Sequence, residues 1–208
     1  MKTTLFLLAT MLAYQAPVSA EEIQTKEVFI TKGVLNVEVI HNGKKIKIQR
    51  NQDRDNKIDS LYQRTTQGKV QPMHPFAPHE VETIGELELL DYLQQQGNDK
   101  SILVVDSRTA SWVKRGTIPG SINIPFTAFK DEDDAVEIME KHFNVFQGAA
   151  LNFSEAKTLV MFCNGNWCPQ SPIAIRKLLA LGYPAAKIKY YRGGMQSWHS
   201  LGLTVIAP

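Results

Sequence analysis

The stretch Lys157-Thr-Leu-Val-Met-Phe-Cys163-Asn-Gly-Asn-Trp-Cys168-Pro-Gln-Ser171-Pro172 joins a short apolar run to a loop that carries both cysteines of the chain. Residues 157–163 have the length and continuous hydrophobicity of a strand that is buried on both faces of a sheet. A helix is predicted over 172–181, because Pro172 suits a first helical turn and Ser171 suits an N-cap. The stretch therefore predicts a strand, a cysteine loop and a helix in direct succession.

The residues on either side of this stretch continue the alternation of strands and helices. Thr83, with Glu86 three residues later, has the pattern of a capping box that opens an amphipathic helix, and Gly97 marks the end of that helix. This alternation predicts an α/β fold with a mostly parallel central sheet and helices on both faces. The predicted strands are 101–106, 122–124, 157–163 and 188–191, and the further helices are 131–143, 172–181 and 195–201.

Residues 21–77 have a different pattern and are interpreted as an N-terminal extension with a β-hairpin. Residues 34–40 and 45–48 alternate apolar and polar side chains on either side of Asn42-Gly43, which is a strong hairpin signal. Apolar side chains at helical spacing near residues 58–62 predict one short helix. Prolines then interrupt the chain up to residue 78, where we place the start of the main domain, 78–208.

Residues 1–20 have the features of a secretory signal peptide. Lys2 gives a positive start, an apolar run follows, and Val18-Ser-Ala20 forms a small-residue cleavage pattern with cleavage expected after Ala20. The run is shorter than the roughly 20 residues of a membrane span, and we expect no span in the mature chain. The sequence thus predicts a periplasmic or secreted protein. With 23 basic and 21 acidic residues and a net charge of +2, it also argues against a nucleic-acid partner.

Cys163 is the candidate catalytic residue. In open α/β sheets, sites form beyond the carboxyl ends of the strands, and here a helix N-terminus follows the cysteine directly. Backbone N–H groups and the positive end of the helix dipole lower a thiol pKa and stabilise an anion, so we expect a depressed pKa at Cys163. The expected substrate-binding loop comprises Asn164, Gly165, Asn166, Trp167, Gln170 and Ser171.

Cys168 is the candidate resolving thiol. A disulfide across so short a loop stabilises a fold little, so a pair this close indicates chemistry more than structure. Two arrangements stay open: Cys168 attacks a persulfide on Cys163 to release sulfide and form a disulfide, or its sulfur is turned away and only its N–H serves the site. Met73, His74 and His79 lie in a proline-rich stretch without a haem-attachment motif, and we predict neither metal nor cofactor.

Several blocks together resemble the rhodanese (sulfurtransferase) domain over about residues 80–208. The resemblance implies the rhodanese α/β fold and a persulfide intermediate on Cys163. It also implies supporting structural roles for Asp106 and Arg108, and for the Gly193-Gly194 turn beneath the site. The blocks are Val104-Val-Asp-Ser-Arg108, Gly116-Thr-Ile-Pro-Gly-Ser-Ile-Asn-Ile-Pro125, Cys163, Arg192-Gly-Gly-Met-Gln-Ser-Trp198 and Gly202-Leu-Thr-Val205. The Pro72-Met-His-Pro-Phe76 segment with Glu82-Thr-Ile-Gly-Glu-Leu-Glu88 resembles an exported bacterial subgroup.

The cysteine loop departs from the family pattern. It is about two residues longer, Gln170 stands where a basic residue often closes the loop, and Thr117 stands where histidine is common. The loop therefore offers an anion its backbone amides but no guanidinium, which argues against thiosulfate as natural donor and against phosphatase activity.

Three functions are compatible with these residues. The first is a periplasmic sulfurtransferase that takes sulfur from a small donor and passes it from Cys163 to a thiol or other thiophilic acceptor. The second is a thiol–disulfide or persulfide reductase that uses Cys163 and Cys168 with a periplasmic redox protein. The third is a non-catalytic binding module that retains the fold and holds a partner through the extension.

Overall fold

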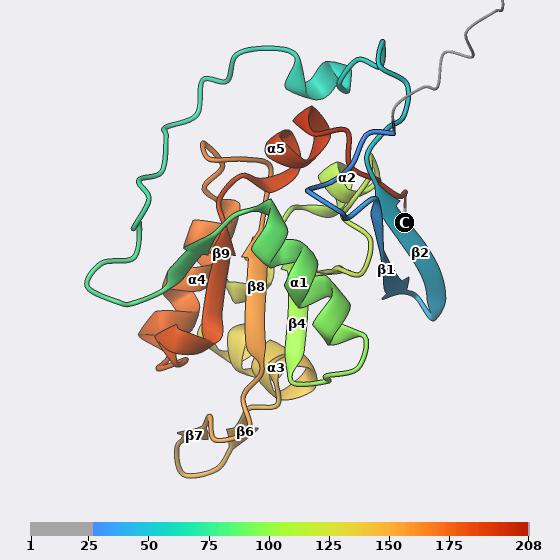
Figure 1. The fold of residues 1–208 in the computed structure, drawn as a ribbon. Coiled ribbons are helices and arrows are strands. Elements are labelled where there is room, and N and C mark those ends of the chain that lie inside the picture. Colours follow the sequence, from blue (N-terminus) through green and yellow to red (C-terminus); the bar gives the residue numbers. More distant parts are fainter. Residues whose placement is uncertain (1–26, 208) are drawn as a thin grey trace, which may run out of the picture.

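The computed structural model describes residues 27–207, and a five-stranded parallel sheet lies at its centre (Figure 1). The strand order is β3-β9-β8-β4-β5, so that β8 lies in the middle of the sheet. All neighbouring strands are parallel, and Phe162 of β8 pairs with Asp106 and Tyr191, so three strands end at the same level. The strands are β3 (Glu82–Ile84), β4 (Ile102–Asp106), β5 (Ile122–Asn123), β8 (Thr158–Phe162) and β9 (Ile188–Tyr191).

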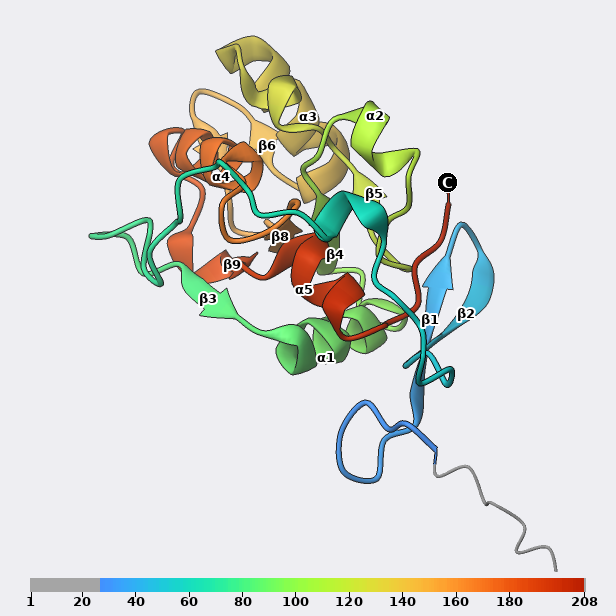
Figure 2. The same ribbon diagram turned by 90° about the horizontal axis from the view of Figure 1, so that it is seen from above.

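Helices cover both faces of the sheet, which confirms the predicted α/β fold (Figures 1 and 2). Leu159 and Met161 of β8 pack with α3 and α4, whereas Val160 and Phe162 pack with α1 and α5. This alternation explains the continuous apolar run, because both faces of a central parallel strand are buried. The helices are α1 (Glu86–Gln96), α2 (Ala110–Val113), α3 (Glu132–Phe143), α4 (Gln170–Ala180) and α5 (Gly194–Ser200). A small hairpin of β6 (Phe146–Gln147) and β7 (Leu151–Asn152) links α3 to β8.

The predicted N-terminal hairpin is confirmed as β1 (Asn36–His41) and β2 (Lys44–Gln49). Asn42 and Gly43 connect the strands with φ angles of 48° and 76°, as a tight two-residue turn requires. The buried side chains of Val37, Val39 and Ile48 belong to the same hydrophobic cluster as α1 and α5. The hairpin is therefore part of the core rather than an appendage.

The segment between the hairpin and β3 is mostly irregular. The short helix expected near residues 58–62 is only a 3₁₀ turn, Ser60–Tyr62, whose first N–H groups are capped by Asp59. Figure 1 shows the segment passing over the end of the sheet near α5, and Figure 2, which looks down on that end, shows it crossing between α4 and α5. Phe76 then enters the core on the α4 side.

Two predicted caps are wrong. Thr83 does not open α1, because it pairs with Tyr190 in β3; the N-cap is Gly85, whose N–H donates to Glu88 Oε2 at 3.0 Å. Ser171 is not the N-cap of α4, because that helix already begins at Gln170. Its hydroxyl is therefore not needed to cap the helix.

The predicted signal peptide, residues 1–20, lies outside the described residues. Between residues 27 and 207, no helix combines the length and the hydropathy that a membrane crossing requires.

Candidate functional site

Cys163 follows the last residue of β8 directly and is 1% exposed. The start of α5 lies against the backbone of its loop: Met195 N–H donates to Cys163 O at 3.0 Å and Gln196 N–H to Asn164 O at 2.8 Å. Gly194 has a φ of 55°, and a Cβ atom there would collide with Cys163 O. The glycine pair at the start of α5 thus allows this helix to support the cysteine loop from below.

The two thiols lie together in the interior. Cys168 is also 1% exposed, both cysteines are free thiols, and Cys163 Sγ donates to Cys168 O at 3.4 Å. The N–H of Cys168 donates to Gly165 O at 2.9 Å and closes a turn within the loop. The side chain of Cys168 also interacts with that of Cys163, so its sulfur is not turned away from the site as one of the two arrangements requires. Attack of Cys168 on a persulfide stays a prediction.

The two thiols have opposite pKa shifts. Burial raises the pKa of Cys163 well above its usual value, and the hydrogen bond to Cys168 raises it further; the N–H and hydroxyl of Ser171 oppose this rise. The hydrogen bond from Cys163 lowers the pKa of Cys168 to about 7, with help from the N–H groups of Asn164 and Gln170. The expected depressed pKa is therefore found at Cys168 and not at Cys163, because desolvation outweighs the helix N-terminus.

Two buried hydroxyl groups that have no hydrogen-bond partner among residues 27–207, those of Ser171 and Tyr190, lie close enough to the thiols to interact with them electrostatically. The Ser171 side chain lowers the pKa of Cys163. Burial raises the pKa of Tyr190, and the charges of both cysteines raise it further. Buried hydroxyl groups without partners are uncommon in folded proteins, so these donors suit an anionic group bound at the sulfur. The unpartnered buried side-chain atoms among residues 27–207 are the hydroxyl oxygens of Ser107, Ser171 and Tyr190, Oε1 of Gln170 and Nε of Arg50.

Asp106 and Arg108 form a buried ion pair at the end of β4. Arg108 donates to Asp106 through Nε at 2.9 Å and through Nη2 at 2.6 Å, and Nη2 also donates to Gly116 O at 2.7 Å. Thr117 Oγ1 donates to Asp106 Oδ2 at 2.7 Å and Arg108 N–H to Asp106 Oδ1 at 3.0 Å, so the carboxylate has four donors. Ser107 N–H donates to Phe162 O at 2.9 Å and joins this network to the strand that carries Cys163. Because both charges are paired and hydrogen-bonded, the network holds the strand ends rigidly.

The remaining loop residues point to different neighbours. Trp167 Nε1 donates to Gln196 Oε1 at 2.7 Å, which fastens the outer part of the loop to α5. The Asn164 side chain and the Asn166 carbonyl, by contrast, accept hydrogen bonds from residues of the N-terminal extension. Gln170 is the first residue of α4, and Gly193 is the N-cap of α5.

Two residues at the site were missed by sequence reasoning. Tyr62 donates from its hydroxyl to Asn164 Oδ1 at 3.3 Å, and burial raises its pKa to about 12, so the hydroxyl keeps its proton at neutral pH. Gln71 N–H donates to Asn166 O at 2.7 Å, and Gln71 O accepts from Arg192. Only Tyr62 gave a sequence signal, as an apolar residue at helical spacing, because Gln71 makes these contacts with its backbone groups.

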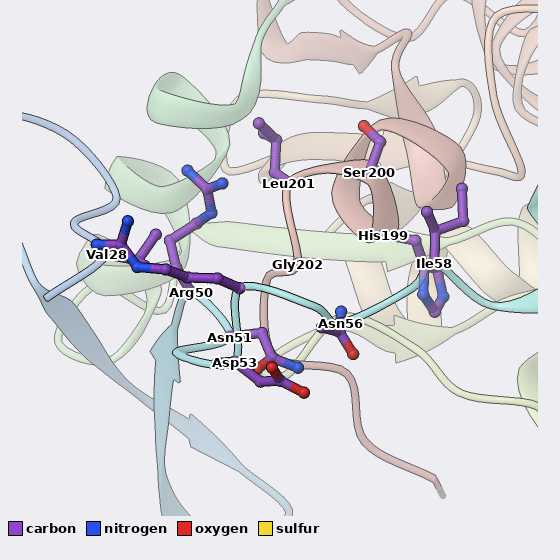
Figure 3. A pocket seen from close by; sticks show the side chains of 11 residues that line it. Val28, Arg50, Asn51, Asp53, Asn56, Ile58, His199, Ser200, Leu201 and Gly202 are labelled. Atoms are coloured by element: carbon purple, nitrogen blue, oxygen red, sulfur yellow. Dashed lines mark hydrogen bonds between the residues drawn. The ribbon is translucent and has the colours of Figure 1, made fainter. Parts of the chain in front are cut away.

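A polar hollow lies where the extension meets the end of α5, and it contains neither cysteine (Figure 3). Figure 3 shows side chains from residues 50–56 on one side and His199 and Ser200 on the other. Asn51 N–H donates to Gly202 O at 2.7 Å, and the rings of His199 and Tyr62 lie 4.8 Å apart. The hollow thus marks the junction that places Tyr62 beside the cysteine loop.

Known proteins resemble this chain over the part that contains the parallel sheet. The model of the rhodanese-like domain matches residues 89–201. No curated protein matches the chain significantly. Similar solved structures include the BH2092 protein from Bacillus halodurans, with 23% identity, a TM-score of 0.44 and coverage of 61% of this chain and 77% of that one. The human single-domain sulfurtransferase TSTD1 has 22% identity, a TM-score of 0.39 and coverage of 57% and 95%. The single-domain sulfurtransferase RDL2 from Saccharomyces cerevisiae has 18% identity, a TM-score of 0.40 and coverage of 61% and 95%.

Proposed function

We propose that this chain, which belongs to the rhodanese-like domain family, is a sulfurtransferase that carries sulfane sulfur as a persulfide on Cys163. The observation that carries the proposal is the position of Cys163 at the end of β8, with the hydroxyl and N–H of Ser171 directed at its sulfur. These donors stabilise negative charge where a persulfide would carry it.

The reaction has two balanced displacements. The Cys163 thiolate attacks the outer sulfur of a donor persulfide, the new S–S bond forms, and the donor leaves as a thiolate that takes up a proton. An acceptor thiolate then attacks the outer sulfur on Cys163, which leaves as a thiolate. The sum converts a persulfide and a thiol into a thiol and a persulfide, so no oxidant or reductant is consumed.

Cys168 provides a base for the first displacement. Cys163 holds its proton because it is buried, whereas Cys168 titrates near neutral pH and lies within hydrogen-bonding reach. Transfer of the proton from Cys163 to Cys168 generates the nucleophile without exposing either sulfur to water.

The Cys163–Cys168 pair also favours a second function, persulfide reduction. The Cys168 thiolate attacks the Cys163 sulfur of the persulfide, the bond to the outer sulfur breaks, hydrosulfide leaves and a Cys163–Cys168 disulfide forms. A dithiol, for example in a periplasmic redox protein, must then reduce that disulfide. The interaction between the two buried cysteine side chains is the observation that supports this function.

One experiment tests both functions. The chain and its Cys163→Ser and Cys168→Ala variants are incubated with thiosulfate, glutathione persulfide or cysteine persulfide, and intact mass and released sulfide are measured. We expect the wild type to gain one sulfur atom from a persulfide and Cys163→Ser to gain none. Thiosulfate should load poorly, because Gln170 supplies no charge at the loop.

The outcomes separate the candidates. Because Cys168 also serves as base in loading, sulfide release is expressed per persulfide loaded on Cys163. Release per loaded sulfur that disappears in Cys168→Ala identifies the reductase, whereas unchanged release per loaded sulfur identifies the transferase. Uptake that survives in Cys163→Ser contradicts the role of Cys163. No uptake from any donor favours the third function, a binding module.

We further propose that the protein acts in the periplasm or is secreted, with a small sulfur donor and a thiol acceptor as partners. The support is the export pattern of residues 1–20. N-terminal sequencing of the exported chain is expected to begin at Glu21, and retention of Met1 would contradict this location.

A further inference from the structure

Residues 62–76, here called the strap, lie along the outer side of the cysteine loop (Figures 1 and 2). Its two ends are anchored in the core. Tyr62 is buried against His199, and Phe76 is buried with its ring 5.5 Å from that of Tyr190. The two anchors belong to the clusters on opposite faces of the sheet, so the strap spans the end of the sheet at which Cys163 lies.

The middle of the strap contacts the loop at few points. Gln71 N–H donates to Asn166 O at 2.7 Å, and Gln71 O accepts from Arg192 Nε at 2.9 Å and Nη2 at 2.6 Å. Gly68 lies so close to Trp167 that a Cβ atom there would come within 2.8 Å of Trp167 O. The backbone of Gln71 therefore links the cysteine loop to the chain that follows β9.

Between its anchors the strap buries almost nothing. Residues 63–70 are all exposed, including Val70 at 67%, and Met73 is 56% exposed. Segments with few buried apolar contacts open locally at low free energy, whereas buried strands open only with global unfolding. The strap's middle can thus leave the loop while both anchors stay in place.

In the present arrangement both cysteines are 1% exposed, and a donor or acceptor needs in-line access to one of the two sulfurs. Thr83 Oγ1 of β3 donates to Met73 O, which fixes the strap at that residue. We propose that the strap is the gate of the site: residues 63–72 swing away from the loop to admit sulfur donor and acceptor, and close over the loaded cysteine between the two steps. Closure keeps water and oxidants from a reactive sulfur species. The persulfide in this proposal rests on the proposed function, but the gating of the two thiols does not.

A backbone substitution tests the gate. Gln71→Pro removes the N–H that donates to Asn166 O, whereas Gln71→Ala retains both backbone groups and is the matched control. The rate of iodoacetamide alkylation at Cys163 and Cys168 is followed by mass spectrometry. One lost hydrogen bond should speed alkylation by about fivefold to tenfold in Gln71→Pro and by less than about twofold in Gln71→Ala.

Alkylation at the wild-type rate in a folded Gln71→Pro variant would overturn the gate. If circular dichroism shows that this variant does not fold, hydrogen exchange of the wild type decides. We expect the Gln71 amide to exchange far faster than the amides of β8, and equal protection would overturn the proposal. Neither measurement requires sulfur transfer, so a failed function and a failed gate are distinguishable.

Discussion

The hairpin and the strap belong to the same N-terminal extension, yet they are held to the domain by different forces. The hairpin buries Val37, Val39 and Ile48 in the cluster of α1 and α5, and Ile48 is 0% exposed. The strap between Tyr62 and Phe76 is mostly exposed and is held at its centre by the backbone of Gln71. Apolar burial makes the first half part of the fold, and sparse polar contacts leave the second half free to regulate access. One extension can thus supply both stability and control.

The largest expected effect is a loss of stability that tests whether the hairpin belongs to the core. Ile48→Ala should lower the free energy of unfolding by about 2–5 kcal/mol, because it removes a fully buried side chain and leaves a cavity. The matched control is Ile40→Ala on the same hairpin, where the side chain is 43% exposed and the loss should stay below about 0.5 kcal/mol. The measurement is urea denaturation. Equal, small losses in both variants would show that the hairpin contributes nothing to the core.

The sequence could predict those features of the fold and the site that depend on local patterns of residues. The turn at Asn42-Gly43, the strand 188–191 and the position of Cys163 follow from local patterns of apolar residues and glycine, and the structure has all three. The sequence match over residues 89–201 agrees with the predicted family. Each of these features depends on residues that are neighbours in the chain.

The features that could not be predicted depend on contacts between distant residues. The strand β3 is three residues long and exists because it pairs with β9, which also removes Thr83 from its expected capping role. Gln71 reaches Asn166 through backbone groups, which leave no pattern in the sequence. The pKa of Cys163 was predicted in the wrong direction, because the depth of its burial depends on the whole fold.

The smallest expected effect is a shift in the pKa of Cys168. It tests whether the strap controls only access to the thiols and not their ionisation. The first cause of the low pKa of Cys168, about 7, is the hydrogen bond from Cys163, and the strap is not among its causes. Cys163→Ala removes this donor, so the pKa of Cys168 should rise toward the value of about 8.5 of an unperturbed thiol. Cys163→Ser keeps a hydroxyl donor and should retain the lower pKa.

A higher pKa means less thiolate at pH 7, so alkylation of Cys168 in Cys163→Ala should be slower there and should converge with that of Cys163→Ser above about pH 10. The measurement is the alkylation rate between pH 5 and pH 10, corrected for any change in the limiting rate. Gln71→Pro should instead raise the rate at every pH without moving the midpoint, because it changes access and leaves the neighbours of Cys168 in place. A midpoint that moves in Gln71→Pro, or stays in Cys163→Ala, would show that the strap and the thiol pair are not independent.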